Sequence, residues 1–424
     1  MAILAGAAAG CALYSDVYVQ PLRMVPTDVR RGSDIADSVA IGDYGRAIEL
    51  AHMVDEKARP TASELLLLGR AEMISGRIDA ARQHLTRAWE MDAVRESPQI
   101  AWTLSQTEYM SKDFAAASRW AEIAFNHGIR VVPWHREFLR SLSSVHVNAM
   151  TEPHSVTVPM GYGNPRIPRI DVHVNGTPIR AVIDSGAVLS IISRELAEKT
   201  NARLLGTFTG TFFGLLGEPI AVSFATIDTL DIGGLIIHDV PVAIMPDEKM
   251  NFFVVNRQTM KMDLLLGASL LREFRTELDF RRKRVTLTPV VLLPFAPADD
   301  QNLFLVGFRP VIKTAINRRG WYLFLLDTGS EVSFLNDRLV GTTRVRYSPR
   351  LHGALLQGLG GARKRGEKIE RVELGICEWG GLFRTIPLYS SEKDDTVGIV
   401  GENFLEHFKV TLDFSRMRLD ITPD

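Results

Sequence analysis

The chain has 424 residues, which is room for two or three domains of ordinary size. Its formal net charge is −1 and 46% of its residues are hydrophobic, so composition gives no support for nucleic acid as a partner and indicates globular cores. The two cysteines, Cys11 and Cys377, cannot form a disulfide framework, and without a histidine cluster they make no zinc site.

Residues 1–20 contain a short run of small apolar residues, Ala2 to Gly10, directly before Cys11. This pattern resembles the end of a bacterial lipoprotein signal. The resemblance implies a lipidated Cys11, membrane attachment through it and a periplasm-facing place in the cell envelope. No Lys or Arg precedes the run, and the alternative is an apolar N-terminus on an otherwise soluble protein.

Residues 28–145 are predicted to form a helical domain, because Ala, Leu and Glu are frequent there and Gly and Pro are few. Similar segments recur around Ala47, Ala81 and Ala117, at periods of 34 and 36 residues. This resembles tetratricopeptide repeats, whose small residues let paired helices pack closely. The resemblance implies either a protein partner on the concave face or a platform that packs on the next domain.

Residues 146–168 are rich in Pro and Gly and are predicted to be a linker. The periodicity after them is typical of strands, in two similar stretches at 169–295 and 303–424. An apolar strand leads into Asp184-Ser185-Gly186-Ala187 in the first stretch and into Asp327-Thr328-Gly329-Ser330 in the second. Leu278-Asp279-Phe280 and Leu412-Asp413-Phe414, near the two ends, are 134 residues apart, so the sequence predicts a duplication.

Each stretch also has an apolar-apolar-Gly element, Leu265-Leu266-Gly267 and Ile399-Val400-Gly401. The order of these motifs, found twice, resembles the retropepsin and pepsin group of aspartic peptidases. The resemblance covers residues 166–424 and implies an all-β fold of two lobes related by a pseudo-two-fold axis. The whole chain is thus expected to be a multidomain α and β protein.

The two aspartates suit peptide hydrolysis, because two carboxyls held about 3 Å apart share one proton and supply both an acid and a base. Asp184 and Asp327 are therefore the predicted catalytic pair, acting without a metal or an organic cofactor. Ser185, Gly186, Thr328, Gly329 and Ser330 are expected to support the two loops. An Asp-x-Gly alone is more often a turn, but here both follow buried-type apolar runs.

Two Gly-rich stretches follow the acidic motifs and are predicted to be hairpin flaps that close over a substrate. The candidate flap residues are Phe212, Phe213 and Gly214 in the first stretch and Leu359 and Gly360 in the second. Pepsin-like enzymes carry a flap tyrosine, which is missing at these tips, so the resemblance implies closure in the retropepsin manner.

The motifs differ at one position, Ala187 against Ser330. In pepsin-like lobes a hydroxyl there can donate to the aspartate of its own lobe, which favours ionisation. The resemblance therefore implies that Asp327 is the more readily ionised member and that Asp184 more often carries the proton.

The predicted function is an aspartic endopeptidase that hydrolyses peptide bonds with a water activated between the two aspartates. The alternative is a non-hydrolytic peptide-binding adaptor, in which the helical repeats bind a partner and the β part is a clamp. A further alternative pairs each lobe with a lobe of another chain, although the short joint at 290–302 favours pairing within one chain.

Overall fold

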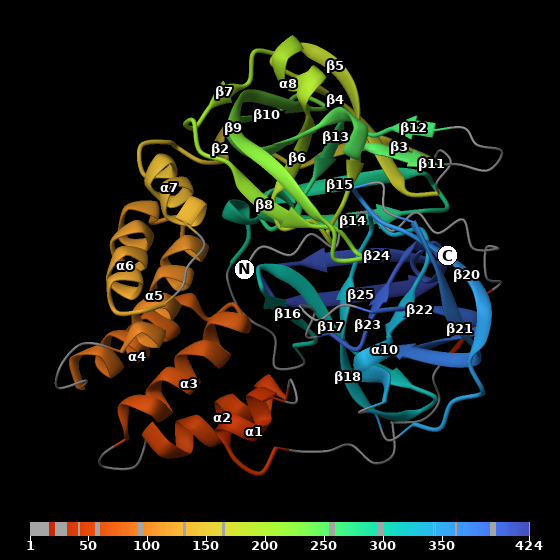
Figure 1. Cartoon of the computed structure of the whole chain (residues 1–424), viewed down its shortest axis with the longest axis horizontal. Coiled ribbons are helices and arrows are strands. Elements are labelled where there is room, and N and C mark those ends of the chain that lie inside the picture. The colour runs from red at the N-terminus through yellow and green to blue at the C-terminus, as the bar shows by residue number, and fades with distance from the viewer. Residues whose placement is uncertain are drawn as a thin grey trace. The chain divides into compact units, whose positions relative to one another are not determined.

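The computed structural model describes residues 17–21, 32–40, 43–55, 60–91, 97–129, 133–162, 166–253, 259–294, 301–341, 343, 345–360, 363–390 and 396–423. These residues form two compact units. The helical unit lies within residues 30–147, and the β unit consists of the strand at 17–21 together with the chain from Asn148 onward. Figure 1 shows both, with the helices in red to orange and the later strands in yellow to blue. A helical N-terminal region followed by a β-rich part agrees with the sequence prediction.

The helical unit contains seven helices among its described residues. They are α1 (Ile35–Ala40), α2 (Tyr44–Asp55), α3 (Ala62–Ile74), α4 (Ile78–Met91), α5 (Pro98–Met110), α6 (Phe114–Asn126) and α7 (Pro133–Leu142). Local signals set several of their starts. Thr61 and Glu64 form a capping box at α3, Pro98 is the first residue of α5, and Asp113 accepts from the Ala116 N–H at the start of α6.

Small residues allow consecutive helices of this unit to approach closely. A Cβ on Gly69 of α3 would lie 2.5 Å from Leu85 Cγ of α4, so a larger residue would push the two helices apart. Ala81 and Ala117, at equivalent places in α4 and α6, are fully buried. The Ser105 hydroxyl of α5 also donates to Ala117 O of α6 at 2.7 Å. Consecutive helices therefore pack closely through alanine and glycine contacts.

The β unit begins with β1 (Val17–Pro21) and resumes after the helical unit. Its next strands are β2 (Ala149–Thr151), β3 (Val156–Tyr162), β4 (Pro168–Val174), β5 (Thr177–Ile183), β6 (Ser190–Ser193), β7 (Arg203–Leu204), β8 (Gly210–Phe213), β9 (Pro219–Ile232), β10 (Leu235–Met245), β11 (Asn251–Phe253), β12 (Thr259–Lys261), β13 (Leu264–Leu266), β14 (Phe274–Asp279) and β15 (Arg284–Pro289). We call residues 166–294 the first lobe.

The second lobe, residues 301–423, holds β16 (Leu303–Val306), β17 (Arg309–Ile316), β18 (Arg319–Leu326), β19 (Phe334–Asn336), β20 (Leu351–Gln357), β21 (Arg363–Ile376), β22 (Trp379–Tyr389), β23 (Gly398–Val400), β24 (Phe408–Asp413) and β25 (Arg418–Pro423). Short helices α8 (Arg194–Lys199), α9 (Ala268–Leu271), α10 (Asp337–Val340) and α11 (Glu402–Leu405) complete the unit.

The predicted linker at 146–168 differs from the structure. Strand β2 pairs with β10, and β3 pairs with both β4 and β15, so this segment is part of the β unit. Val156, Val158 and Met160 alternate inward and are buried. The proline and glycine content indicated turns, but strand pairing with distant partners determines the local structure here.

A shared sheet joins the two lobes in the order β25-β24-β14-β15-β3. In its centre β14 of the first lobe pairs antiparallel with β24 of the second. Arg275 faces Asp413, Glu277 faces Thr411, and Asp279 faces Lys409. Residues of β14 and β24 that are 134 positions apart in the chain are equivalent in the two lobes. The central facing pair, Glu277 and Thr411, consists of two such equivalent residues. The pairing of β14 with β24 is therefore symmetric about this central pair.

Candidate active site

Each predicted aspartate follows a buried strand. Asp184 comes directly after β5, and Asp327 comes directly after β18. The neighbouring parallel strand is the apolar-apolar-Gly element in both lobes: β13 lies beside β5, and β23 lies beside β18. The Asp184 N–H donates to Leu266 O at 3.0 Å, and the Asp327 N–H donates to Val400 O at 3.0 Å. The same scaffold thus holds both loops.

The glycines after these apolar pairs are required by close backbone contacts. A Cβ on Gly267 would lie 2.5 Å from the carbonyl carbon of Leu189, and a Cβ on Gly401 would lie 2.6 Å from Val332 O. Real Cβ atoms do not approach backbone atoms this closely, so the glycines let the strand lie directly under each aspartate loop.

Two hydroxyls cross between the lobes. The Ser185 hydroxyl donates to Leu326 O at 2.6 Å and accepts from the Thr328 N–H at 3.0 Å. In the mirror arrangement the Thr328 hydroxyl donates to Ile183 O at 2.8 Å and accepts from the Ser185 N–H at 3.1 Å. Both side chains are buried, so these four hydrogen bonds fix the two loops against each other.

This clasp brings the two carboxyl groups together. A Cβ on Gly329 would lie 2.5 Å from Asp184 Cγ, which places the Asp184 carboxyl against the loop of Asp327. Asp184 and Asp327 are 0% and 1% exposed. Two buried carboxyls side by side cannot both ionise cheaply, so the pair can hold one proton and one charge.

The hydrogen bonds to the carboxyls are unequal. Asp184 Oδ1 accepts the N–H groups of Gly186 and Ala187, each at 3.0 Å. Asp327 Oδ1 accepts the Gly329 N–H at 2.9 Å. Burial raises the pKa of Asp327 well above its usual range, and the charge of Asp184 raises it further, whereas the Gly329 N–H and the charge of Arg309 oppose the shift.

The hydrogen bond on which the predicted assignment of the proton rests is not found in this loop. The Ser330 hydroxyl donates to Val332 O at 2.8 Å and not to the Asp327 carboxyl, because the loop turns it toward its own backbone. Ala187, in contrast, supplies its backbone N–H to Asp184. The backbone hydrogen bonds thus favour the charge on Asp184.

The candidate flaps are the hairpins β8–β9 and β20–β21. Phe212 and Phe213 lie on strand β8, where Phe212 packs edge-on to Phe224 with ring centroids 6.0 Å apart. Gly214 begins the turn that returns at Glu218. Phe212 is 2% exposed, so it belongs to the core under the hairpin and the tip is formed by the residues that follow.

The two hairpin tips meet each other. A Cβ on Gly214 would lie 2.5 Å from Leu359 O, and a Cβ on Gly358 would lie 2.7 Å from Leu215 Cβ. The Gly360 N–H also donates to Lys249 O of the first lobe at 3.1 Å, and Gly360 has a φ of +101° that suits glycine. Leu359 is fully buried. The tips of the two hairpins are therefore in contact with each other.

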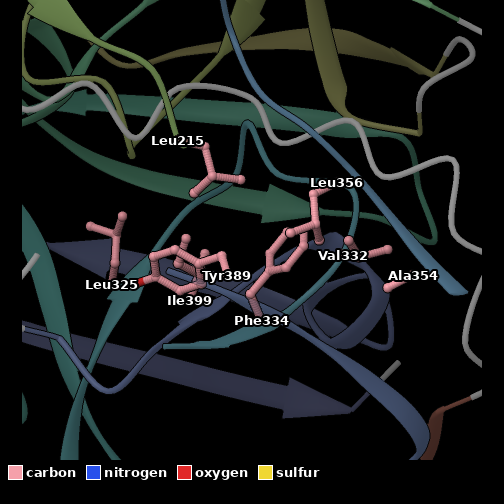
Figure 2. Close-up of a cluster of buried hydrophobic side chains, with 8 residues drawn as sticks. All are labelled: Leu215, Leu325, Val332, Phe334, Ala354, Leu356, Tyr389 and Ile399. Atoms are coloured by element: carbon pink, nitrogen blue, oxygen red, sulfur yellow. The ribbon is translucent and has the colours of Figure 1, made fainter. Parts of the chain in front are cut away.

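Leu215 crosses from the first hairpin into an apolar cluster of the second lobe, as Figure 2 shows. Leu215 is 4% exposed. The other members of the cluster are Leu325, Val332, Phe334, Ala354, Leu356, Tyr389 and Ile399. Leu325 stands two residues before Asp327, so the cluster begins beside the aspartates. No signal in the local sequence indicates that Leu215 enters the other lobe.

A cavity of about 900 Å³ opens next to this cluster. Leu216, Ala354, Leu356 and Tyr389 form part of its apolar wall, and Asp337, His352, Lys364, Arg365 and Glu367 bring charge to it. Gln357, the last residue of β20, is fully buried, and neither atom of its amide has a hydrogen-bond partner among the described residues.

The remaining predicted features give little to a site. Cys11 lies outside the described residues. Across the described ranges, no three His, Cys, Asp or Glu side chains are arranged to hold a metal ion. No helix in those same ranges is long and apolar enough to cross a bilayer.

Comparison with known proteins agrees with an aspartic protease domain. The family described as aspartyl protease matches residues 170–270, a segment that contains Asp184 and β13 but not Asp327. The crystal structure of a retropepsin-like aspartic protease from Rickettsia conorii is similar at 17% identity, over 33% of this chain and 94% of that chain, with a TM-score of 0.21. No curated protein matches the chain. The family match thus supports an aspartic protease domain that includes residues 170–270.

Proposed function

We propose that the protein is an aspartic endopeptidase whose catalytic pair is Asp184 and Asp327, one from each of two duplicated lobes. The observation that carries this proposal is the crossed pair of hydroxyls, Ser185 and Thr328, which hold the aspartate loops face to face. Two unrelated Asp-x-Gly turns are not expected to form four reciprocal buried hydrogen bonds with each other. Burial of both carboxyls gives the shared proton that the chemistry requires.

In the proposed reaction a water lies between the carboxyls. Asp184, as the carboxylate, takes a proton from this water while the water oxygen attacks the carbonyl carbon of the peptide bond. Asp327, as the acid, donates its proton to the carbonyl oxygen. When the C–N bond of the tetrahedral diol breaks, Asp184 gives its proton to the leaving nitrogen and Asp327 takes a proton from a diol hydroxyl. Asp184 is then again the carboxylate and Asp327 again the acid.

The substrate would lie extended between the hairpins and the aspartates, with backbone hydrogen bonds of the kind made in strand addition. In the closed arrangement, Leu215 fills the apolar cluster and Leu359 lies against Gly214. The tips must separate before a peptide enters. Closure by two hairpins, one from each lobe, would be closure in the retropepsin manner.

Pairing of the lobes within one chain is supported by the symmetric register of β14 and β24. A single chain then holds a complete pair of aspartates. The test is purified protein with a diverse peptide mixture at several pH values, beside Asp184→Asn and Asp327→Asn. Cleavage by wild type, its loss in each variant and no recovery on mixing them support the proposal. Recovery on mixing would show that lobes pair between chains, and binding without cleavage would favour the adaptor.

For the helical unit we propose tetratricopeptide-like repeats, with α3 and α4 as one repeat and α5 and α6 as the next. The close contact of Gly69 with Leu85 and the buried Ala81 and Ala117 support it. Such an array would bind a protein partner or the distal part of a substrate. The test is whether the full chain binds a peptide and whether changes to exposed residues of these helices abolish the binding. Loss of binding in these variants would support a binding role over a packing platform.

A further inference from the structure

A third buried carboxyl lies under the loop of Asp327. Glu402 is the first residue of α11 and follows the Ile399-Val400-Gly401 element. It is 1% exposed, and neither side-chain oxygen has a hydrogen-bond partner among the described residues. A carboxyl buried without hydrogen bonds is costly, so its place beside the aspartates calls for a role.

The two lobes differ at this position. The Glu402 N–H donates to Ser330 O at 2.8 Å, and the Ala268 N–H of the first lobe donates to Ala187 O at 2.7 Å. The backbone link to the aspartate loop is therefore the same in both lobes. Only the loop of Asp327 has a carboxyl beneath it, whereas the loop of Asp184 has a methyl group.

The charged groups around Glu402 come from several elements. Burial is the largest cause that raises the pKa of Glu402. The charges of Glu406 and Asp327 raise it further, and the charge of Arg166 opposes the shift. Arg166 is itself engaged, because its guanidinium pairs with Glu406 and its N–H donates to Glu331 at 3.1 Å. Strand β24 also packs on α11; its Lys409 and Asp413 pair with Glu277 and Arg275 of β14. Strand β1 brings no charged residue.

We propose that Glu402 is a positioning residue that acts through Asp327 and keeps the shared proton on Asp327 as the pH rises. The inference rests on the proposed peptidase function. A negative charge on Glu402 would oppose a second negative charge on Asp327, since both are buried in the same lobe. Deprotonation of Glu402 thus delays full ionisation of the pair and extends activity on the alkaline side.

The first test is the pH profile of peptide cleavage by the full chain. Glu402→Gln keeps the shape of the side chain, and Glu402→Ala copies the first lobe. In both variants the alkaline limb of kcat/KM should move to lower pH by about one unit. A purely structural role would lower activity at every pH without moving the limb, and that result, or a limb that moves upward, would overturn the proposal.

The second test does not need activity. Thermal unfolding of wild type, Glu402→Gln, Asp327→Asn and the double variant is measured at pH 5 and pH 8. At pH 8 each single change should raise the unfolding temperature of the β unit, by at least about 2 °C for Glu402→Gln. The two gains should be less than additive at pH 8, because either change relieves the same repulsion, and additive at pH 5.

Glu108→Gln is the matched control. Glu108 is also a buried glutamate, but it is paired with Arg82 at 2.9 Å in the helical unit, so its variant should lose stability and leave the alkaline limb in place. If wild type cleaves no peptide, the proposed function fails. The unfolding temperatures of the four proteins still test whether Glu402 and Asp327 repel each other. Less than additive gains at pH 8 support it, and additive gains at both pH values overturn it.

Discussion

The hydroxyl clasp between the lobes gives a direct test of how the aspartates are held. Thr328→Val keeps the shape of a fully buried side chain and removes one donor and one acceptor. Ile183 O and the Ser185 N–H then lose their bonds of 2.8 and 3.1 Å. Leaving a buried backbone group unsatisfied costs about 1–3 kcal/mol, so the two together should cost about 2–6 kcal/mol. Cavity formation adds little, since valine and threonine have similar volumes.

The assay is thermal unfolding of the full chain, read on the transition of the β unit. A loss of this size lowers the transition by at least about 4 °C. Cleavage should fall mainly in kcat, by roughly 10–100-fold, because displaced loops misplace both carboxyls. Thr314→Val is the matched control: Thr314 is fully buried in β17, and its hydroxyl has no hydrogen-bond partner among the described residues. If both variants behave alike, or Thr328→Val costs under about 1 kcal/mol, the clasp does not hold the site.

Four further predictions follow from the site. Leu215→Ala should weaken hairpin closure and raise KM for apolar peptides at least several-fold, which peptide kinetics would detect; an unchanged KM would mean that the cluster does not face the substrate. Ser330→Ala should leave the acidic limb of the pH profile within about 0.3 units, because its hydroxyl bonds to backbone, whereas a shift of a full unit would restore the original assignment of the proton. The raised pKa of Asp327 adds stability below pH 4 that is lost as pH rises through the raised value, so Asp327→Asn should unfold like wild type near pH 3 and at higher temperature at pH 7; the reverse order would contradict it. If Cys11 is lipidated, Cys11→Ser should move the protein from the membrane to the soluble fraction with peptide cleavage retained, and a wild type found only in the soluble fraction would rule lipidation out.

The sequence could predict the two acidic motifs because the same local signal occurs twice, each time ahead of an apolar-apolar-Gly element. The duplication also predicted that Leu265-Leu266-Gly267 and Ile399-Val400-Gly401 would have the same role, and both lie beside an aspartate strand. These features depend on contiguous residues, which pattern reasoning reads well.

The remaining features depend on pairing between distant segments. Phe212 and Phe213 lie on a strand because β8 pairs with β9 up to Pro219, and nothing local places the turn after them. The Ser330 hydroxyl could have reached Asp327 or its own backbone, and only the loop conformation decides. Glu402 differs from its equivalent in the first lobe, Ala268, but this difference alone does not show that the carboxyl is buried.

Strand β1 has a consequence for how the chain is made. It lies on the sheet of the second lobe, with Val17 opposite Phe383 and Pro21 opposite Trp379, and Gln20 donates to Glu373, 353 residues further along the chain. At about 5–20 residues per second, translation supplies that partner roughly 20–70 s after β1. The edge strand of the finished sheet is therefore synthesised long before the strand on which it pairs. A truncated protein started after the helical unit would leave the edge of β22 open to pairing with other chains, and an internal deletion that keeps residues 17–21 avoids this hazard.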